Sequence, residues 1–212
     1  MIKESNFTQW TKQKLEHAFG IQRVSENNEL TNWLNGTVEI TKSEKETLMT
    51  LAKRSAPYLE DWNEIELITK FIAPVTNLVD FDTDKFKLFA GRKISATLNG
   101  TKLNGIVDAI VATGTQDPEK PFFCLHEYKR SARAIADPAG QLLSEMLAIQ
   151  TLNNDNQPVY GVYVLASNWF FVVLDKKKYA ISPFYNALSE QILDIFKSLK
   201  YLKVIIEKRV GK

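Results

Sequence analysis

The sequence predicts a mixed α/β fold, in which N-terminal helices precede a three-strand meander, a crossover helix, a further strand and a closing helix. Three observations carry this prediction. Apolar residues recur at helical spacing through the first eighty or so residues. From about residue 86 the pattern changes to shorter apolar runs bounded by turn residues. A helix start at Asp137-Pro138 then separates two such runs, as expected for a crossover between strands of one sheet.

Helical periodicity places the N-terminal helices at residues 6–19, 28–33, 45–56 and 63–79. Ser43 and Glu46 have the spacing of a capping box and are expected to open the third helix. Pro74 lies inside the fourth helix, where it predicts a kink because proline lacks the N–H that the helix needs.

The strands follow in a regular order. Asn99-Gly100 is a strong hairpin signal between strands 86–98 and 101–113, and a third strand covers residues 122–129. The crossover helix is expected to run from its cap at Asp137 to about residue 153. The remaining elements are a strand at 159–165, a hairpin of strands 169–174 and 178–182, and a last helix over 184–208.

Length and composition are those of one compact enzyme-sized unit. The chain has 212 residues, 44% hydrophobic and 25% charged, and needs no disulfides to stabilise its core. We expect a helical extension, residues 1–60, packed on a core of residues 61–212. The single cysteine, Cys124, is expected to be a buried thiol. The polar N-terminus and the lack of a long apolar segment predict a cytoplasmic protein without a membrane anchor.

Charge is distributed unevenly although the net charge is only +2. Residues 58–84 are acidic, whereas residues 197–212 are basic, and Arg130 and Arg133 form a smaller basic group. The basic groups have two interpretations. In the first, the basic side chains bind along the phosphate backbone of a nucleic acid. In the second, the C-terminal run is the solvated face of a helix.

The most informative residues are Asp108, Glu127 and Lys129. Asp108 lies inside the apolar run 106–111, and Glu127 and Lys129 end an apolar strand. Strand residues i and i+2 share a face, so Glu127 and Lys129 point the same way, toward a position that Asp108 also faces. Buried carboxylates need a partner or a cation. Two carboxylates and an ammonium therefore predict a site for a divalent cation and a phosphate, with a structural salt bridge as the alternative.

With these residues in place, the chain resembles the PD-(D/E)XK nuclease superfamily, whose members share a restriction-endonuclease-like core. The resemblance covers roughly residues 63–182. It implies that Asp108 is the metal-binding aspartate, that Glu127 is the second acid and that Lys129 is the catalytic lysine. Because of their positive charge beside these carboxylates, Arg130 and Arg133, which follow the motif directly, are expected to contact nucleic acid.

Residues 63–74 and the crossover helix are similar to the nuclease domains of type I restriction subunits. This resemblance implies that Glu64 completes the acidic site, with Glu66 as the alternative, and that Gln141 is the glutamine of the crossover helix. Val107 replaces the nominal proline of the family, and Glu145 stands where those domains have a tyrosine. The helicase motor of those subunits is absent, because the chain contains no phosphate-binding Gly-x-x-x-x-Gly-Lys motif.

The expected cofactor is Mg²⁺ or Mn²⁺, held by the hard oxygen ligands of Asp108 and Glu127, by the Tyr128 backbone carbonyl and, in one arrangement, by Glu64. The predicted activity is metal-dependent hydrolysis of phosphodiester bonds, with DNA as the expected partner and a homodimer as one arrangement that such folds adopt. The alternative is a catalytically silent member of the fold that binds nucleic acid or a protein.

Other side chains favour structural roles. Only two histidines occur, His17 and His126, so a histidine-rich zinc site is excluded. His126 is expected to point away from the face of Glu127. Residues 169–171 form the aromatic run Trp-Phe-Phe, which is typical of core packing, with a stacking surface for unpaired bases as the alternative.

Overall fold

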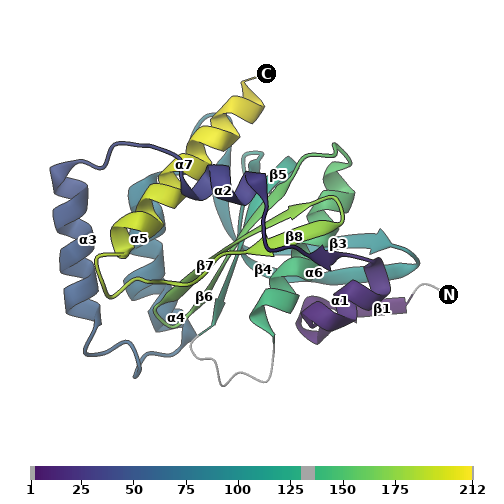
Figure 1. Ribbon diagram of the computed structural model, residues 1–212, viewed down its shortest axis with the longest axis horizontal. Coiled ribbons are helices and arrows are strands. Elements are labelled where there is room, and N and C mark those ends of the chain that lie inside the picture. The colour runs from purple at the N-terminus through teal and green to yellow at the C-terminus, as the bar shows by residue number, and fades with distance from the viewer. Residues whose placement is uncertain (1–2, 130–136, 212) are drawn as a thin grey trace.

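The computed structural model describes residues 3–129 and 137–211, which build a nine-stranded mixed sheet with helices on both faces (Figure 1). Along the sheet the order is β1 (Lys3–Asn6), β4 (Thr101–Thr113), β5 (Glu119–Lys129), β6 (Val159–Leu165), β7 (Asn168–Asp175), β8 (Lys178–Ile181) and β2 (Gln22–Arg23). β3 (Lys87–Leu98) also pairs with β4, and β9 (Tyr185–Asn186) pairs with β7. The β1–β4, β5–β6 and β2–β8 pairs are parallel, and the others are antiparallel.

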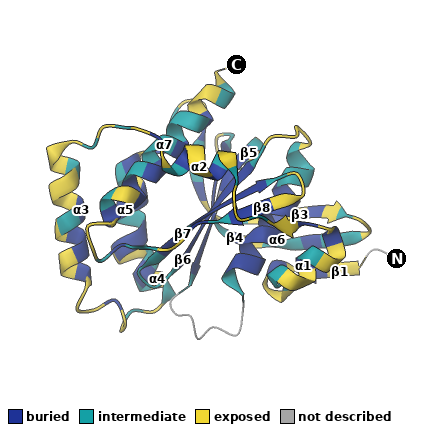
Figure 2. Ribbon diagram, viewed as in Figure 1, coloured by how far each residue is buried: buried dark blue, intermediate teal, exposed yellow. Residues whose placement is uncertain are grey.

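Helices cover both faces of this sheet (Figure 1). One face carries α2 (Asn28–Leu34), α3 (Lys42–Ser55), α4 (Glu64–Leu67), a π-helical turn (Ile68–Ile72), α5 (Ala73–Val79) and α7 (Ile192–Val210). The other face carries a 3₁₀ turn (Phe7–Gln9), α1 (Lys12–Phe19) and α6 (Pro138–Asn153). Figure 2 shows that the strands between these two layers are the most buried part of the chain.

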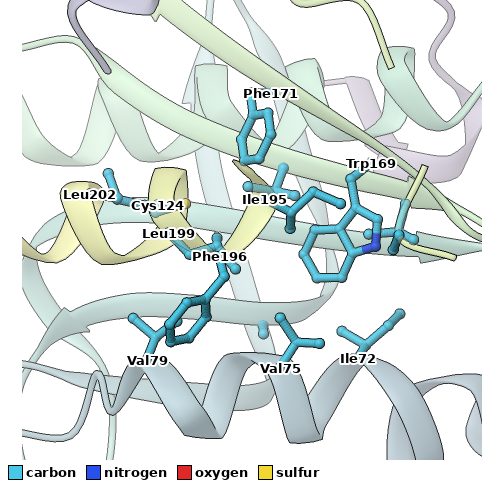
Figure 3. Close-up of a cluster of buried hydrophobic side chains, with 14 of the residues drawn as sticks. Ile72, Val75, Val79, Cys124, Trp169, Phe171, Ile195, Phe196, Leu199 and Leu202 are labelled. Carbon is cyan, nitrogen blue, oxygen red and sulfur yellow. The ribbon is translucent and has the colours of Figure 1, made fainter. Parts of the chain in front are cut away.

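Each face of the sheet has its own apolar core. In the first core, Trp169 and Phe171 of β7 meet Phe196 of α7 and Val75 of α5 (Figure 3). Trp33 of α2 joins α7 through its Nε1, which donates to the Ser198 carbonyl at 2.8 Å. The second core lies between the sheet and α6, and every residue from Ala139 to Ile149 is buried. α6 is therefore enclosed by the sheet on one side and by the N-terminal segment on the other.

The central part of the predicted order is confirmed. β4, α6 and β6 have the predicted limits, and Asp137 caps α6 by accepting a hydrogen bond from Gly140 N at 3.1 Å. Asn99 and Gly100 both adopt positive φ, 50° and 74°, as a tight hairpin turn between β3 and β4 requires. Because α6 connects the parallel strands β5 and β6, it is the predicted crossover helix.

Four local predictions were wrong. The N-terminal region is not entirely helical, because β1 and β2 pair in the sheet with strands that lie far along the chain. The helix predicted from residue 6 begins at Lys12, after the 3₁₀ turn. The capping box of α3 is Thr41 with Glu44, one turn before the predicted helix start. The last helix begins at Ile192 rather than at residue 184, because Tyr185–Asn186 pairs with β7.

Pro74, where a kink is predicted, lies in the first turn of α5, immediately after the π turn. Proline lacks an N–H for the carbonyl four residues earlier, and a π turn rearranges the hydrogen bonding at that point. α4, the π turn and α5 thus form one irregular helical stretch that begins at Glu64. Among the helices of the described ranges, none combines the length and apolarity that a membrane crossing needs.

Candidate functional site

Asp108 lies where the pairing of β4 with β5 ends. The last register pair in that direction is Ala109 with His126, and beyond it the Asp108 Oδ2 accepts a hydrogen bond from Tyr128 N at 2.7 Å. The carboxylate therefore replaces a strand carbonyl as the partner of this N–H. Val107 packs in the second core and Ala109 in the first, so the alternation of faces breaks at Asp108.

Glu127 and Lys129 project from the same face of β5, as their spacing predicts. Glu127 is completely buried, and its Oε1 lies 2.6 Å from the Nζ of Lys129. Apart from Lys129 and the Asp108 carboxyl group, with which it can share a proton, the Glu127 carboxyl group has no hydrogen-bond partner within the described ranges. Lys129 also reaches Glu64 at the start of α4, with 3.7 Å between Nζ and Oε2. Elements far apart in the sequence thus bring two carboxylates, those of Glu127 and Glu64, to one lysine.

α6 adds Gln141 and Glu145, which lie one helical turn apart. The Gln141 Nε2 donates to the Glu145 Oε1 at 3.2 Å, and both side chains are buried. Gln141 Oε1 and Glu145 Oε2 have no hydrogen-bond partner in the part of the chain that the structure describes. Glu145 was missing from the predicted site residues. The signal that identifies it is its charge, since no other residue of Pro138–Asn153 is charged, together with its position four residues after Gln141.

Burial dominates the electrostatics of this cluster. Burial, reinforced by the negative charge of Asp108, raises the pKa of Glu127 to about 8. Burial and then the charge of Glu127 raise the pKa of Glu145 well above its usual range. The pKa of Asp108 is also raised by burial, against the opposing effects of the Tyr128 N–H and Lys129. The three acids therefore hold protons at a pH where exposed carboxyl groups have lost them.

Lys129 responds in the opposite sense to its surroundings. Burial alone would lower its pKa, but the carboxylates of Glu127, Asp108 and Glu64 raise it above the usual value. The ammonium is thus held in its charged form at the centre of the acids. A group of this kind can hydrogen-bond an anionic oxygen without first gaining a proton.

The two acids of α4 have different surroundings. Glu64 lies against Lys129, whereas Glu66 completes the capping box by accepting from Asn63 N at 3.0 Å and pairs with Lys70 at 2.7 Å. The geometry therefore brings Glu64, rather than the alternative Glu66, to the cluster.

The basic residues predicted to contact nucleic acid lie in two segments, and the structure describes only the C-terminal one. Arg130 and Arg133 lie outside the described residues. In the C-terminal run, Lys200 pairs with Glu44 at 2.9 Å, and Arg209 donates to the Pro158 carbonyl at 2.9 Å. These two side chains connect α7 to its neighbours.

His126 and Cys124 occupy the structural positions that the sequence predicts. His126 is completely buried, and its Nδ1 lies 2.8 Å from the Tyr128 hydroxyl, on the side of β5 away from Glu127. Burial lowers the pKa of His126 to about 4. Cys124 is a buried thiol in the first core.

The cluster presents only hard oxygen donors and one ammonium, a chemistry suited to a divalent cation and a phosphate. Within residues 3–129 and 137–211, no three carboxylate, imidazole or thiol side chains are grouped so as to hold a metal ion. Mg²⁺ commonly takes one or two carboxylates and completes its coordination with water oxygens. No family model matches the chain, and no curated protein matches it in sequence.

Proposed function

We propose that the protein is a metal-dependent nuclease, built on a restriction-endonuclease-like core, that hydrolyses phosphodiester bonds of nucleic acid, with DNA as the expected substrate. The observation that carries the proposal is the buried carboxylate of Glu127. One of its oxygens lies 2.6 Å from Lys129, and the acids Asp108 and Glu145 lie close enough to raise or share its proton binding. Acids crowded together inside the protein destabilise the fold, which favours a functional reason for their presence.

Asp108 and Glu127 fit a divalent cation because their oxygens are hard ligands and a cation would offset the repulsion between these two neighbouring buried carboxylates. The Tyr128 carbonyl would be the third protein ligand. When bound, Mg²⁺ or Mn²⁺ would supply charge neutralisation at the scissile phosphate and a lowered pKa for a bound water. Cation binding would also displace the protons that burial keeps on the two carboxyl groups.

Lys129 would hold an oxygen of the scissile phosphate, or the attacking water, by electrostatic attraction and hydrogen bonding. Because its pKa is raised, the lysine acts in this proposal as a charged donor rather than as a free base. Glu64, at 3.7 Å, would keep the ammonium in position from the exposed side. Gln141 would orient Glu145 through their hydrogen bond and offer its free carbonyl oxygen to the cluster.

A cleavage assay tests the proposal directly. Labelled duplex DNA, single-stranded DNA and RNA would each be incubated with the protein in Mg²⁺ or Mn²⁺. The Lys129→Met variant is expected to lose about 10²–10³-fold in rate, the usual effect of removing one electrostatic donor at a reacting centre. Lys102→Met is the matched control, because Lys102 also pairs with a glutamate, Glu4, at 2.7 Å, but on the exposed surface.

Two results would contradict the proposal. One is that no substrate is cut although the protein is folded and the metal is present. The other is that Lys129→Met and Lys102→Met cut at the wild-type rate. In a parallel measurement, Mg²⁺ or Mn²⁺ should raise the Tm of the wild type but not of Asp108→Asn, because the variant lacks an anionic ligand.

A further inference from the structure

A row of aromatic side chains begins beside Glu127 on the same face of the sheet. Glu127 of β5 is the register partner of Tyr163 on the parallel strand β6, and Tyr163 is the partner of Phe170 on β7. The Tyr163 and Phe170 rings stack, with centroids 4.4 Å apart and planes inclined by only 7°. The Phe184 ring follows at 6.2 Å from Phe170. We call Tyr163, Phe170 and Phe184 the aromatic row.

The row becomes more exposed with distance from Glu127. Tyr163 is buried, Phe170 is half-buried and Phe184 is 55% exposed. Its neighbours in the aromatic run, Trp169 and Phe171, point to the opposite face and are completely buried in the first core (Figure 3). The aromatic run therefore has two uses: alternate residues build the core, and Phe170 extends a line of rings from the acidic cluster to the surface.

We propose that the accessible end of the aromatic row, Phe170 and Phe184, stacks the unpaired bases of a single-stranded nucleic acid whose backbone is held at Lys129. This inference rests on the proposed nuclease function and names its substrate class. Aromatic side chains bind bases through their π-faces without regard to sequence. In a duplex those faces are already stacked on neighbouring bases, so a row of rings beside the reacting phosphate favours an unpaired strand.

The dimensions agree with this assignment. β5 and β7 are separated by two strand spacings, about 10 Å, which is the length of about three stacked bases at roughly 3.4 Å each. Tyr163 supports Phe170 by stacking on it, and Phe184, inclined by 55° to Phe170, provides the exposed end of the row. Burial raises the pKa of Tyr163 to about 12, so its hydroxyl stays protonated and can donate to a phosphate or a base.

The test measures binding separately from cleavage. A fluorescent oligothymidylate of about twelve nucleotides is titrated with the protein in Ca²⁺, a hard oxygen-binding cation used in place of Mg²⁺, and anisotropy gives the Kd. Phe184→Ala should weaken binding by about 5- to 150-fold, the usual range for one lost base–aromatic contact. Phe184→Leu should weaken it similarly, because leucine is apolar but has no π-face, and Phe184→Trp should keep or improve the affinity.

Tyr58→Ala is the matched control, since Tyr58 is 56% exposed, as much as Phe184, but lies away from the row. It should leave the Kd unchanged. Oligouridylate and a DNA duplex form the other two arms, and the duplex should show no effect of Phe184→Ala. Comparison of thymidylate with uridylate shows whether the strand is DNA or RNA.

The proposal is overturned if the wild type binds neither oligonucleotide, if Phe184→Ala and Tyr58→Ala have equal affinities, or if Phe184→Leu binds like the wild type. These outcomes are distinct from failure of the nuclease function. If binding depends on Phe184 but no cleavage occurs in Mg²⁺ or Mn²⁺, the base-stacking proposal is supported and the nuclease proposal is rejected. If cleavage occurs but the Phe184 substitutions do not change binding, the nuclease proposal is supported and the base-stacking proposal is rejected.

Discussion

At the residue scale, Glu145 is a buried acid whose presence does not stabilise the fold. Its carboxyl group is completely buried on α6, and one of its oxygens has no partner among the described residues. Its other oxygen accepts a hydrogen bond from Gln141. Such a group must take up a proton to enter the core, so it opposes folding more strongly as the pH rises. Acids placed at this disadvantage are concentrated at functional sites.

Glu145→Gln should therefore stabilise the protein in the absence of metal. The amide has the shape of the protonated acid and carries no charge, so we expect the free energy of unfolding to rise by about 1–3 kcal/mol at neutral pH. Urea denaturation in EDTA measures the change. The same substitution at the exposed Glu190 is the control and should change little. A less stable Glu145→Gln variant would show that the ionised form is satisfied in the fold.

At the scale of elements, α6 presents Gln141 and Glu145 to β5 because its first turn packs very closely against the N-terminal segment. A Cβ atom added to Gly140 would lie 2.6 Å from both the Trp10 carbonyl oxygen and the Thr11 Cα. Both contacts are backbone atoms, which cannot turn aside as a flexible side chain would. Lys12 holds the same junction through its ion pair with Asp137 at 2.6 Å.

Gly140→Ala tests this junction. Helix propensity alone would make alanine more stable by about 1 kcal/mol. We expect the opposite sign, a loss of about 1–3 kcal/mol, because the added methyl group forces α6 away from the N-terminal segment. The Tm should fall by roughly 2–4 °C for each kcal/mol lost in a chain of this size. A Tm equal to or above that of the wild type would show that the junction can relax.

At the scale of the whole molecule, the buried acids give the stability a characteristic pH dependence. The pKa of Glu127 is 4.5 in its ordinary state and about 8 in the fold. Between these values the folded state binds more protons than the unfolded state, so the stability from this group is complete below pH 4.5 and is lost as the pH rises toward 8. Burial raises the pKa of Asp108 and Glu145 too, so they add to the loss in the same direction.

Without metal, the free energy of unfolding of the wild type should therefore decrease from about pH 5 to pH 8. Glu127→Gln removes one of the titrating groups, so its profile should be flatter and should cross above that of the wild type at the alkaline end. Denaturation series in EDTA at several pH values measure both profiles. Parallel profiles for the two proteins would mean that Glu127 does not titrate in this range.

The parts of the fold that were predicted correctly depend on local signals. The limits of β4, α6 and β6 follow from periodicity, from the Asn99-Gly100 turn and from the cap at Asp137, all of which act over a few residues. β1 and β2 were missed because strands of four and two residues carry almost no periodicity and form only by pairing with distant strands. The same reason explains Tyr185–Asn186, which was assigned to the last helix.

For the site, the sequence by itself determined that Glu127 and Lys129 share a face and that Asp108 is a carboxylate in an apolar strand, because side-chain alternation is a property of any strand. Only the tertiary structure decided that Glu64, rather than Glu66, meets the lysine, that Glu145 joins the acids and that Tyr163 follows Glu127 in register. These contacts depend on how helices and strands dock, and docking is set by packing between residues far apart in the chain. The reactive groups can thus be identified from local sequence patterns, whereas the residues that contact them depend on long-range packing.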